Sequence, residues 1–241
     1  MLEERTLPEY KSEIYNSHTP HLVAVDCIIF GFVENELKLL IIKRVMEPCK
    51  GSWSLMGGFV SPEESIDEAA YRILYDLTGL KDLYMTQLYT HGNTDRDQGA
   101  RVISTSYYSL IKIQDINPHH EMISNARWCP INELPELIFD HSKMVEMALY
   151  SLRDEAHRKP IGFELLPPKF TLPQLQSLYE AIYQQKFDKR NFRKSILKMN
   201  LLDQLDEKNK EDSKKGAWLY SFNEEKYKEL LRQGFFFNIP V

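Results

Sequence analysis

The most constraining feature of this 241-residue sequence is a short segment in which two glycines precede a strongly signalled helix. The apolar run WSLMGGFV, residues 53–60, leads into the tetrapeptide SPEE at 61–64. Serine at the N-cap, proline at the first helical position and glutamate three residues after the cap form a capping-box start. We therefore predict a helix from about Pro62 to Leu77, which Gly79 ends because glycine adopts the left-handed conformation without steric cost.

The spacing of residues in this segment resembles the Nudix box, G-x5-E-x7-R-E-U-x-E-E-x-G-U, in which U is aliphatic. The matching positions are Gly58, Glu64, Arg72, Leu74, Gly79 and Leu80. The resemblance implies a Nudix fold, a mixed sheet with flanking helices. In that family the helix glutamates hold divalent metal ions that neutralise a diphosphate and activate water.

The metal-binding glutamates of the pattern are mostly replaced in this chain. The three expected positions hold Ile73, Asp76 and Leu77. Ile73 and Leu77 stand four residues apart on one helix face, so an ion there would meet two aliphatic side chains. We therefore predict a non-catalytic domain that holds neither a metal ion nor another cofactor.

Other acidic residues of the segment have structural interpretations. Glu64 and Arg72 are expected to form an ion pair that holds the loop against the helix. Glu63, Asp67 and Glu68 are candidate substitute metal ligands, but acidic residues in a first helical turn ordinarily favour the helix dipole. A diverged Nudix hydrolase of nucleoside diphosphate derivatives remains the main alternative.

Strand patterns lie on both sides of the box. Between His21 and Arg44, two apolar runs rich in β-branched residues flank the polar sequence ENE, which predicts a β-hairpin. Further strands are predicted at 83–91, at 101–113 and around Trp128.

A helix capped by Asp140 is predicted from about His141 to His157. The following segment, Arg158 to Pro168, contains three prolines and ends the helical pattern. We place the domain boundary there, giving a Nudix-like sensing and dimerisation domain over 1–158 and a second domain over 159–241. The fold class is therefore α+β.

The second domain shows the order of elements of a winged helix-turn-helix. The sequence TLPQ at 171–174 is a second capping-box start, and apolar residues follow at helical spacing. Asp188 is expected to cap another helix over Lys189–Met199. The stretches LLDQLD and AWLYSF then predict two strands joined by a charged loop.

The formal net charge of −5 is unevenly distributed between these two parts. Residues 161–241 carry 14 Lys and Arg against 11 Asp and Glu, a balance of +3, which leaves −8 for residues 1–160. A charge run is usually a solvated face, but recognition helices place N-terminal residues on base edges while wing lysines take phosphates. The DNA-binding candidates are Lys189, Arg190, Asn191, Arg193 and Lys194 on the helix and Lys214 and Lys215 in the wing.

An effector pocket is expected over the sheet beside the Gly57-Gly58 turn, where the backbone approaches closely. Trp53 would stack on a base or sugar, and Asp26 or Lys43 would bond hydroxyl groups. The candidate ligand-binding residues are Asp26, Lys43, Trp53, Gly57, Gly58, Phe59, His91 and Asp95. Each also has an ordinary structural interpretation, such as core packing for Trp53.

The order of the two domains resembles the Nudix-related transcriptional regulators. The resemblance also rests on the stretches TDRDQGARVISTSYYSL and FTLPQLQSLYEAIYQQKFDKRNFRKSIL. It implies a homodimer that binds a double-stranded DNA operator and responds to ADP-ribose or, in a branch resembling the arabinose-responsive regulators of Bacteroides-like bacteria, to a pentose. On this resemblance we expect a sugar or sugar-nucleotide effector and favour an L-arabinose-like pentose over ADP-ribose.

Localisation and the remaining alternative follow from simple patterns. The first fifteen residues lack an apolar signal-peptide core and no apolar stretch approaches the roughly 20 residues of a membrane span, so we expect a cytoplasmic protein without a membrane partner. The three cysteines lie far apart and are expected to be reduced. A ligand-binding module whose winged helix contacts only proteins is the third interpretation, which the basic helix disfavours.

Overall fold

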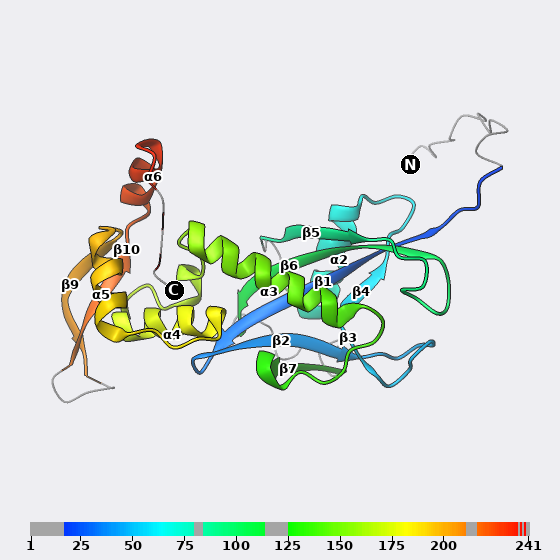
Figure 1. Cartoon of the computed structure of the whole chain (residues 1–241), viewed down its shortest axis with the longest axis horizontal. Coiled ribbons are helices and arrows are strands. Elements are labelled where there is room, and N and C mark those ends of the chain that lie inside the picture. The colour runs from blue at the N-terminus through cyan, green and yellow to red at the C-terminus, as the bar shows by residue number, and fades with distance from the viewer. Residues whose placement is uncertain are drawn as a thin grey trace.

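The computed structural model describes residues 17–79, 84–113, 125–210, 216–235, 237 and 239, apart from the side chains of Leu77 and Glu164. A larger mixed-sheet domain is followed by a smaller winged domain (Figure 1). The α+β fold class predicted from the sequence is therefore confirmed. None of the helices in the described ranges is long and apolar enough to cross a membrane.

The first domain is built on a seven-stranded sheet of order β3-β2-β1-β6-β5, with β4 paired to β1 and β7 paired to β2. In chain order its strands are β1 (Leu22–Val33), β2 (Glu36–Lys43), β3 (Trp53–Ser54), β4 (Met56–Phe59), β5 (Thr86–His91), β6 (Val102–Lys112) and β7 (Ala126–Pro130). Strand β1 is antiparallel to β2 and parallel to β6, so the sheet is mixed. The predicted hairpin is confirmed, and its turn residues Glu34 and Asn35 both have positive φ, as a tight hairpin turn requires.

The two faces of the sheet are covered by different helices. Because side chains alternate along a strand, Ile28 and Phe30 of β1 point to one face while Cys27 and Ile29 point to the other. The first pair packs in the core that includes α3 (His141–Arg158), and the second packs in the core that includes α2 (Ile66–Thr78). The sheet therefore lies between these two helices (Figure 1).

Helix α2 begins later than the sequence pattern predicted. The prediction placed the N-cap at Ser61, but Ser65 is the N-cap and forms the complete capping box with Glu68. Glu64 is engaged elsewhere, because it accepts bonds from Arg72 and from the Ser61 backbone N–H. The predicted stop at Gly79 is confirmed, with φ of 70° in the left-handed region.

The predicted start of α3 at His141 is confirmed, but the predicted cap is wrong. Asp140 occupies the N-cap position and its side chain makes no capping bond. Its carboxylate instead accepts two hydrogen bonds from Arg96. A tertiary ion pair thus replaces the local interaction that the sequence suggested.

The winged domain has the predicted order of elements. It comprises η4 (Phe163–Leu165), β8 (Phe170–Thr171), α4 (Leu172–Tyr183), α5 (Lys189–Lys198), β9 (Leu202–Asn209), β10 (Ala217–Phe222) and α6 (Glu224–Arg232). The capping box of Thr171 with Gln174 and the cap of α5 by Asp188 are both confirmed. Helix α6 was not predicted.

The domains share a continuous core rather than a solvated linker. Leu37 and Met144 of the first domain and Tyr179 and Phe192 of the second belong to one buried cluster. Near the end of the chain, Phe237 packs beside Tyr179, with 6.3 Å between ring centroids. Relative motion of the two domains therefore requires side chains at this joint to repack.

The revised start of α2 can be tested by paired substitutions. Ser65→Ala removes a side-chain acceptor for a helix N–H and should lower the free energy of unfolding by about 1 kcal/mol. Ser61→Ala lies outside the helix and should change that free energy by less than about 0.5 kcal/mol. Urea denaturation of both variants measures the difference. A larger loss of stability in Ser61→Ala than in Ser65→Ala would instead support a helix start at Ser61.

Candidate effector site and nucleic-acid interface

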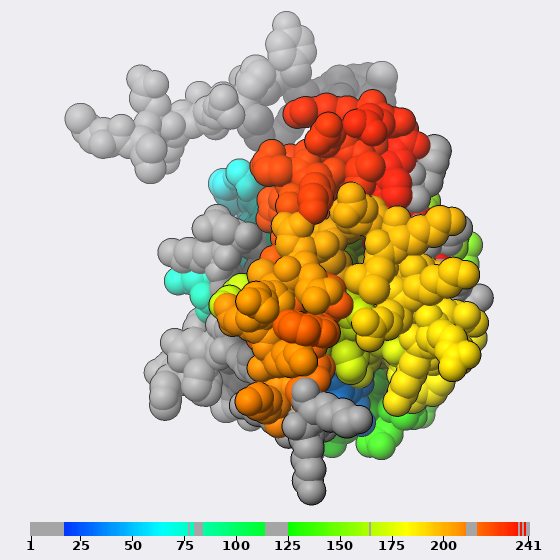
Figure 2. Space-filling model, turned by 90° about the vertical axis from the view of Figure 1, so that its left-hand side faces the viewer, coloured from blue at the N-terminus to red at the C-terminus, as the bar shows by residue number. Residues whose placement is uncertain are grey.

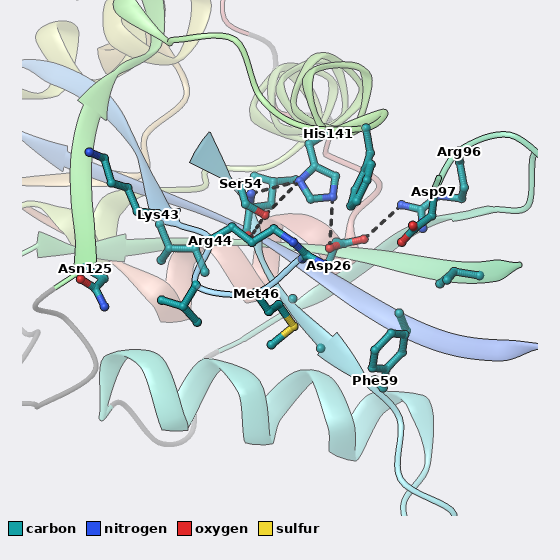
Figure 3. A pocket seen from close by; sticks show the side chains of 18 residues that line it. Asp26, Lys43, Arg44, Met46, Ser54, Phe59, Arg96, Asp97, Asn125 and His141 are labelled. Atoms are coloured by element: carbon teal, nitrogen blue, oxygen red, sulfur yellow. Dashed lines mark hydrogen bonds and ion pairs between the residues drawn. The ribbon is translucent and has the colours of Figure 1, made fainter. Parts of the chain in front are cut away.

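A cavity of about 410 Å³ lies beside the Gly57-Gly58 turn, between β1, β4 and the start of α3. Five of the candidate residues line it: Asp26, Lys43, Gly57, Gly58 and Phe59. Figure 3 shows Asp26 between His141 and Arg96, with Phe59 and Asn125 on opposite sides of the view. The cavity has the size typical of small-molecule sites.

The other three candidates do not line this cavity. Trp53 is covered by the cations of Lys43 and Arg127, which lie 5.4 and 4.7 Å from its ring centroid. His91 bonds the Ser106 hydroxyl at 3.0 Å. Asp95 is likewise absent from the lining. A direct ligand contact from these residues stays a prediction.

A buried polar network forms the floor of the cavity. The Ser104 hydroxyl donates to Asp26 Oδ2 over 2.6 Å, and the Arg96 Nη2 lies 3.4 Å from the same oxygen. His141 Nε2 stands 3.5 Å from Asp26 Oδ1. Asp26 therefore sits where three elements of the domain meet.

Arg96 joins this network to the start of α3. Its Nε and Nη2 donate to the two oxygens of Asp140 over 3.1 and 2.8 Å, a forked arrangement that suits a guanidinium and a carboxylate. Although burial alone would raise the pKa of Asp140, the Arg96 guanidinium holds that pKa below its usual value. The pair is thus charged and fixes the entry to the helix.

The hydrogen bonds of His141 fix its tautomer. The Leu55 backbone N–H donates to Nδ1 over 3.1 Å, so Nδ1 carries no proton in the neutral ring. The proton is then on Nε2, which faces Asp26. Burial lowers the pKa of His141 even though Asp26 and Asp140 lie nearby. The neutral ring accordingly turns its Nε2–H toward the Asp26 carboxylate.

Close backbone approach at the cavity requires glycine at position 57. A Cβ atom there would overlap Asp26 Oδ1 and lie 2.8 Å from the Val25 carbonyl oxygen. At Gly58 a Cβ would lie 3.0 Å from Ile73 Cδ1. The glycine pair therefore accommodates both the Asp26 carboxylate and the aliphatic side chain of α2.

The described acidic residues of the box do not fit a divalent ion. Ile73 is buried in the core, where the family pattern has a glutamate. Glu64 is held by Arg72 at 2.6 Å, and this hydrogen bond together with the Ser61 N–H lowers the pKa of Glu64 to about 2. Asp67 accepts from the Tyr107 hydroxyl, and Glu68 caps its own helix. Glu64, Asp67 and Glu68 thus already have protein partners.

The basic helix α5 presents its charged residues to solvent. Phe192 and Ile196 are buried on one side, whereas the five DNA-binding candidates are exposed: Lys189, Arg190, Asn191, Arg193 and Lys194. Figure 2 shows this end of the molecule, with α5, β9 and α6 on one face. Lys214 and Lys215 lie outside the described residues, so the wing-tip prediction remains open.

The polar network predicts a definite response of stability to pH. Burial lowers the pKa of His91 and His141, so the unfolded chain binds more protons than the folded chain just below pH ~6.5. The contribution of these two histidines to the free energy of unfolding is therefore fully present above about pH 6.5. It is lost as the pH falls through their lowered pKa values in the folded protein. Urea denaturation across pH 5 to 8 measures this slope. His141→Asn should flatten it, whereas the exposed His157→Asn should not.

Comparison with known proteins connects the two domains to described families. The NUDIX domain matches residues 20–148, and the NrtR DNA-binding winged helix domain matches residues 162–222. The "ADPR responsive transcriptional repressor NtrR" of Acinetobacter baylyi is 29% identical over 224 residues, which cover 91% of this chain and 88% of that protein. The ADP-ribose pyrophosphatase of Methanocaldococcus jannaschii is 31% identical over 146 residues, covering 61% of this chain and 80% of that enzyme.

A solved structure shows the same arrangement of both domains. The crystal structure of Shewanella oneidensis NrtR complexed with a 27mer DNA superposes with a TM-score of 0.73 at 27% identity. The match covers 91% of this chain and 99% of that one. Because the NUDIX domain match spans more than half of the chain, the protein belongs to the Nudix family, and an NrtR-type DNA-binding winged helix follows its Nudix domain.

Proposed function

We propose that the protein is a transcriptional regulator in which the Nudix-like domain binds an effector and the winged helix binds DNA. The observation that carries this proposal is the match, over nearly the whole chain, to Shewanella oneidensis NrtR crystallised with a 27mer DNA. The exposed basic face of α5 supports the DNA-binding part. The cavity over the sheet supports the sensing part.

We place ADP-ribose first among the candidate effectors. Both relatives above are named for it, one as a responsive repressor and the other as a pyrophosphatase. The cavity also has suitable chemistry, because Lys43 and Arg44 in its lining would attract a diphosphate and Asp26 would accept ribose hydroxyl bonds. Apolar residues such as Phe59 and Phe139 would cover a base.

A pentose such as L-arabinose, which the sequence resemblance favoured, is the second candidate. The observation in its favour is the concentration of polar groups at the floor, where Asp26, Arg96 and His141 converge. Such groups suit a small ligand rich in hydroxyls. The size of the cavity favours the larger ligand.

The proposed role is binding without hydrolysis. Catalysis by a Nudix domain needs clustered carboxylates for metal ions, and here Ile73 occupies one of those positions in a buried state. The hydrolase alternative retains support from the pyrophosphatase relative, so the effector experiment below includes a turnover measurement.

Ligand binding can be tested with a glycine variant and its matched control. Calorimetry on the full chain should detect ADP-ribose or L-arabinose, and Gly57→Ala should weaken that binding about tenfold or more, ~1.4 kcal/mol, by displacing Asp26. Gly92→Ala is the control because a Cβ there meets nothing within 4 Å.

The same preparations decide between sensor and enzyme. We expect no turnover of ADP-ribose with magnesium or manganese near the usual enzyme range of roughly 1 to 1000 per second. Binding of neither ligand would remove the sensor proposal, and turnover in that range would replace it with the hydrolase.

DNA binding is expected from a homodimer on a near-palindromic site whose half-sites lie about one helical turn apart. Selection of DNA from random sequence by the purified protein identifies the operator. Replacing Arg190, Arg193 and Lys194 together by alanine should lower operator affinity about 100-fold or more, because base and phosphate contacts are lost. The control removes three exposed cations of the first domain: Lys50, Lys143 and Arg158. If the α5 variant kept full affinity and specificity for the operator, α5 would not be the helix that recognises DNA.

A further inference from the structure

Helix α3 reaches from the cavity to the winged domain. It contains 18 residues, a length of ~27 Å at 1.5 Å per residue. At its start, Asp140 is bound to Arg96, and His141 faces Asp26 on the cavity floor. A change in these contacts therefore acts directly on the N-terminal end of α3.

The C-terminal half of α3 is joined to α4 by two hydrogen bonds that run in opposite directions. Arg153 Nε donates to the Ile182 carbonyl oxygen over 3.1 Å. The Tyr183 hydroxyl donates to the Arg153 carbonyl oxygen over the same distance. Ile182 O is among the last carbonyls of α4, which lack a helical partner and attract a cation. The positively charged Arg153 side chain thus bonds the C-terminal end of α4, where a cation is favoured.

An aromatic series continues from this joint into α5. Tyr183 packs against Phe187 with ring centroids 5.8 Å apart, and Phe187 stacks on Phe192 at 5.9 Å. Phe192 is buried in α5 between Asn191 and Arg193 in the sequence. A shift of the end of α4 therefore changes the packing position of α5, the helix that carries the DNA-binding candidates.

We infer that Arg153 is a positioning residue through which α3 couples the polar cavity floor to the position of α5. The inference rests on the proposed function of the cavity as an effector site. A ligand that bonds Asp26 or Arg96 competes with the contacts that hold the start of α3. The helix moves as a unit, and the Arg153 joint passes the displacement to α4. Linkage then requires DNA to change ligand affinity by the same factor.

The first test measures operator affinity with and without ligand. The probes are ADP-ribose and L-arabinose, and the variants are Arg153→Ala and Tyr183→Phe. Both variants should bring the ligand-induced change in operator affinity to within about twofold of none, while ligand affinity without DNA stays within about threefold of wild type. Tyr183→Phe retains the ring and so guards against a folding defect.

The control variant is Arg158→Ala, an arginine of the same helix whose contact among the described residues is with Asp154 of α3. It should retain the full ligand response. An unchanged response in both joint variants would overturn the coupling.

A second test uses neither ligand nor DNA. Asp26→Asn weakens the cavity floor, and hydrogen exchange of the full chain then reports opening at the end of α4 and in residues 184–188. This substitution should speed exchange there about threefold or more with Arg153 present, and have little effect in the Arg153→Ala background. Equal effects in both backgrounds contradict the coupling. Failure of the wild type to bind either probe contradicts the effector proposal alone, because the exchange result stands independently.

Discussion

The arrangement of the first domain depends on the ion pairing of Arg96 with Asp140 and Asp26 inside the protein. Charges taken out of water cost several kcal/mol each unless they are paired and hydrogen-bonded, so these three side chains must be placed together. Asp26 lies on β1, Arg96 follows β5, and Asp140 precedes α3. One network thereby orders a strand, a loop and a helix around the cavity, and it leaves charged groups at the cavity floor where a ligand can compete for them.

Sequence patterns predicted the fold and the position of the cavity because they depend on local rules. The winged helix follows from capping residues at Thr171 and Asp188 and from apolar spacing. Gly58 was identified through the Nudix box, and the cavity was expected beside the turn that it forms with Gly57. These signals are contained within short segments, and the structure retains them.

The errors arose where tertiary contacts select among local alternatives. The stretch SPEESIDE, residues 61–68, contains two consecutive serine-to-glutamate capping patterns. Arg72 takes the glutamate of the first pattern, so only Ser65 and Glu68 form the complete capping box. Arg96 and His141 were not predicted as pocket residues. Their approach to Asp26 depends on tertiary contacts between distant segments, which no short sequence pattern encodes. Helix α6 has no buried residue, and its charged sequence gave no core signal.

The proposed absence of metal-binding carboxylates from one face of α2 agrees with the proposed use of the cavity for sensing. Linkage relates binding equilibria rather than turnover, so a sensor that leaves its ligand intact responds to the ligand concentration at equilibrium. Ile73 supplies buried apolar packing between α2 and Gly58 at a position where a glutamate would need solvent or an ion. Ile73 therefore packs the fold around the cavity, and under this proposal it offers no carboxylate to a catalytic metal ion. Under this proposal, free energy from ligand binding remains available to move α3 instead of being coupled to bond cleavage.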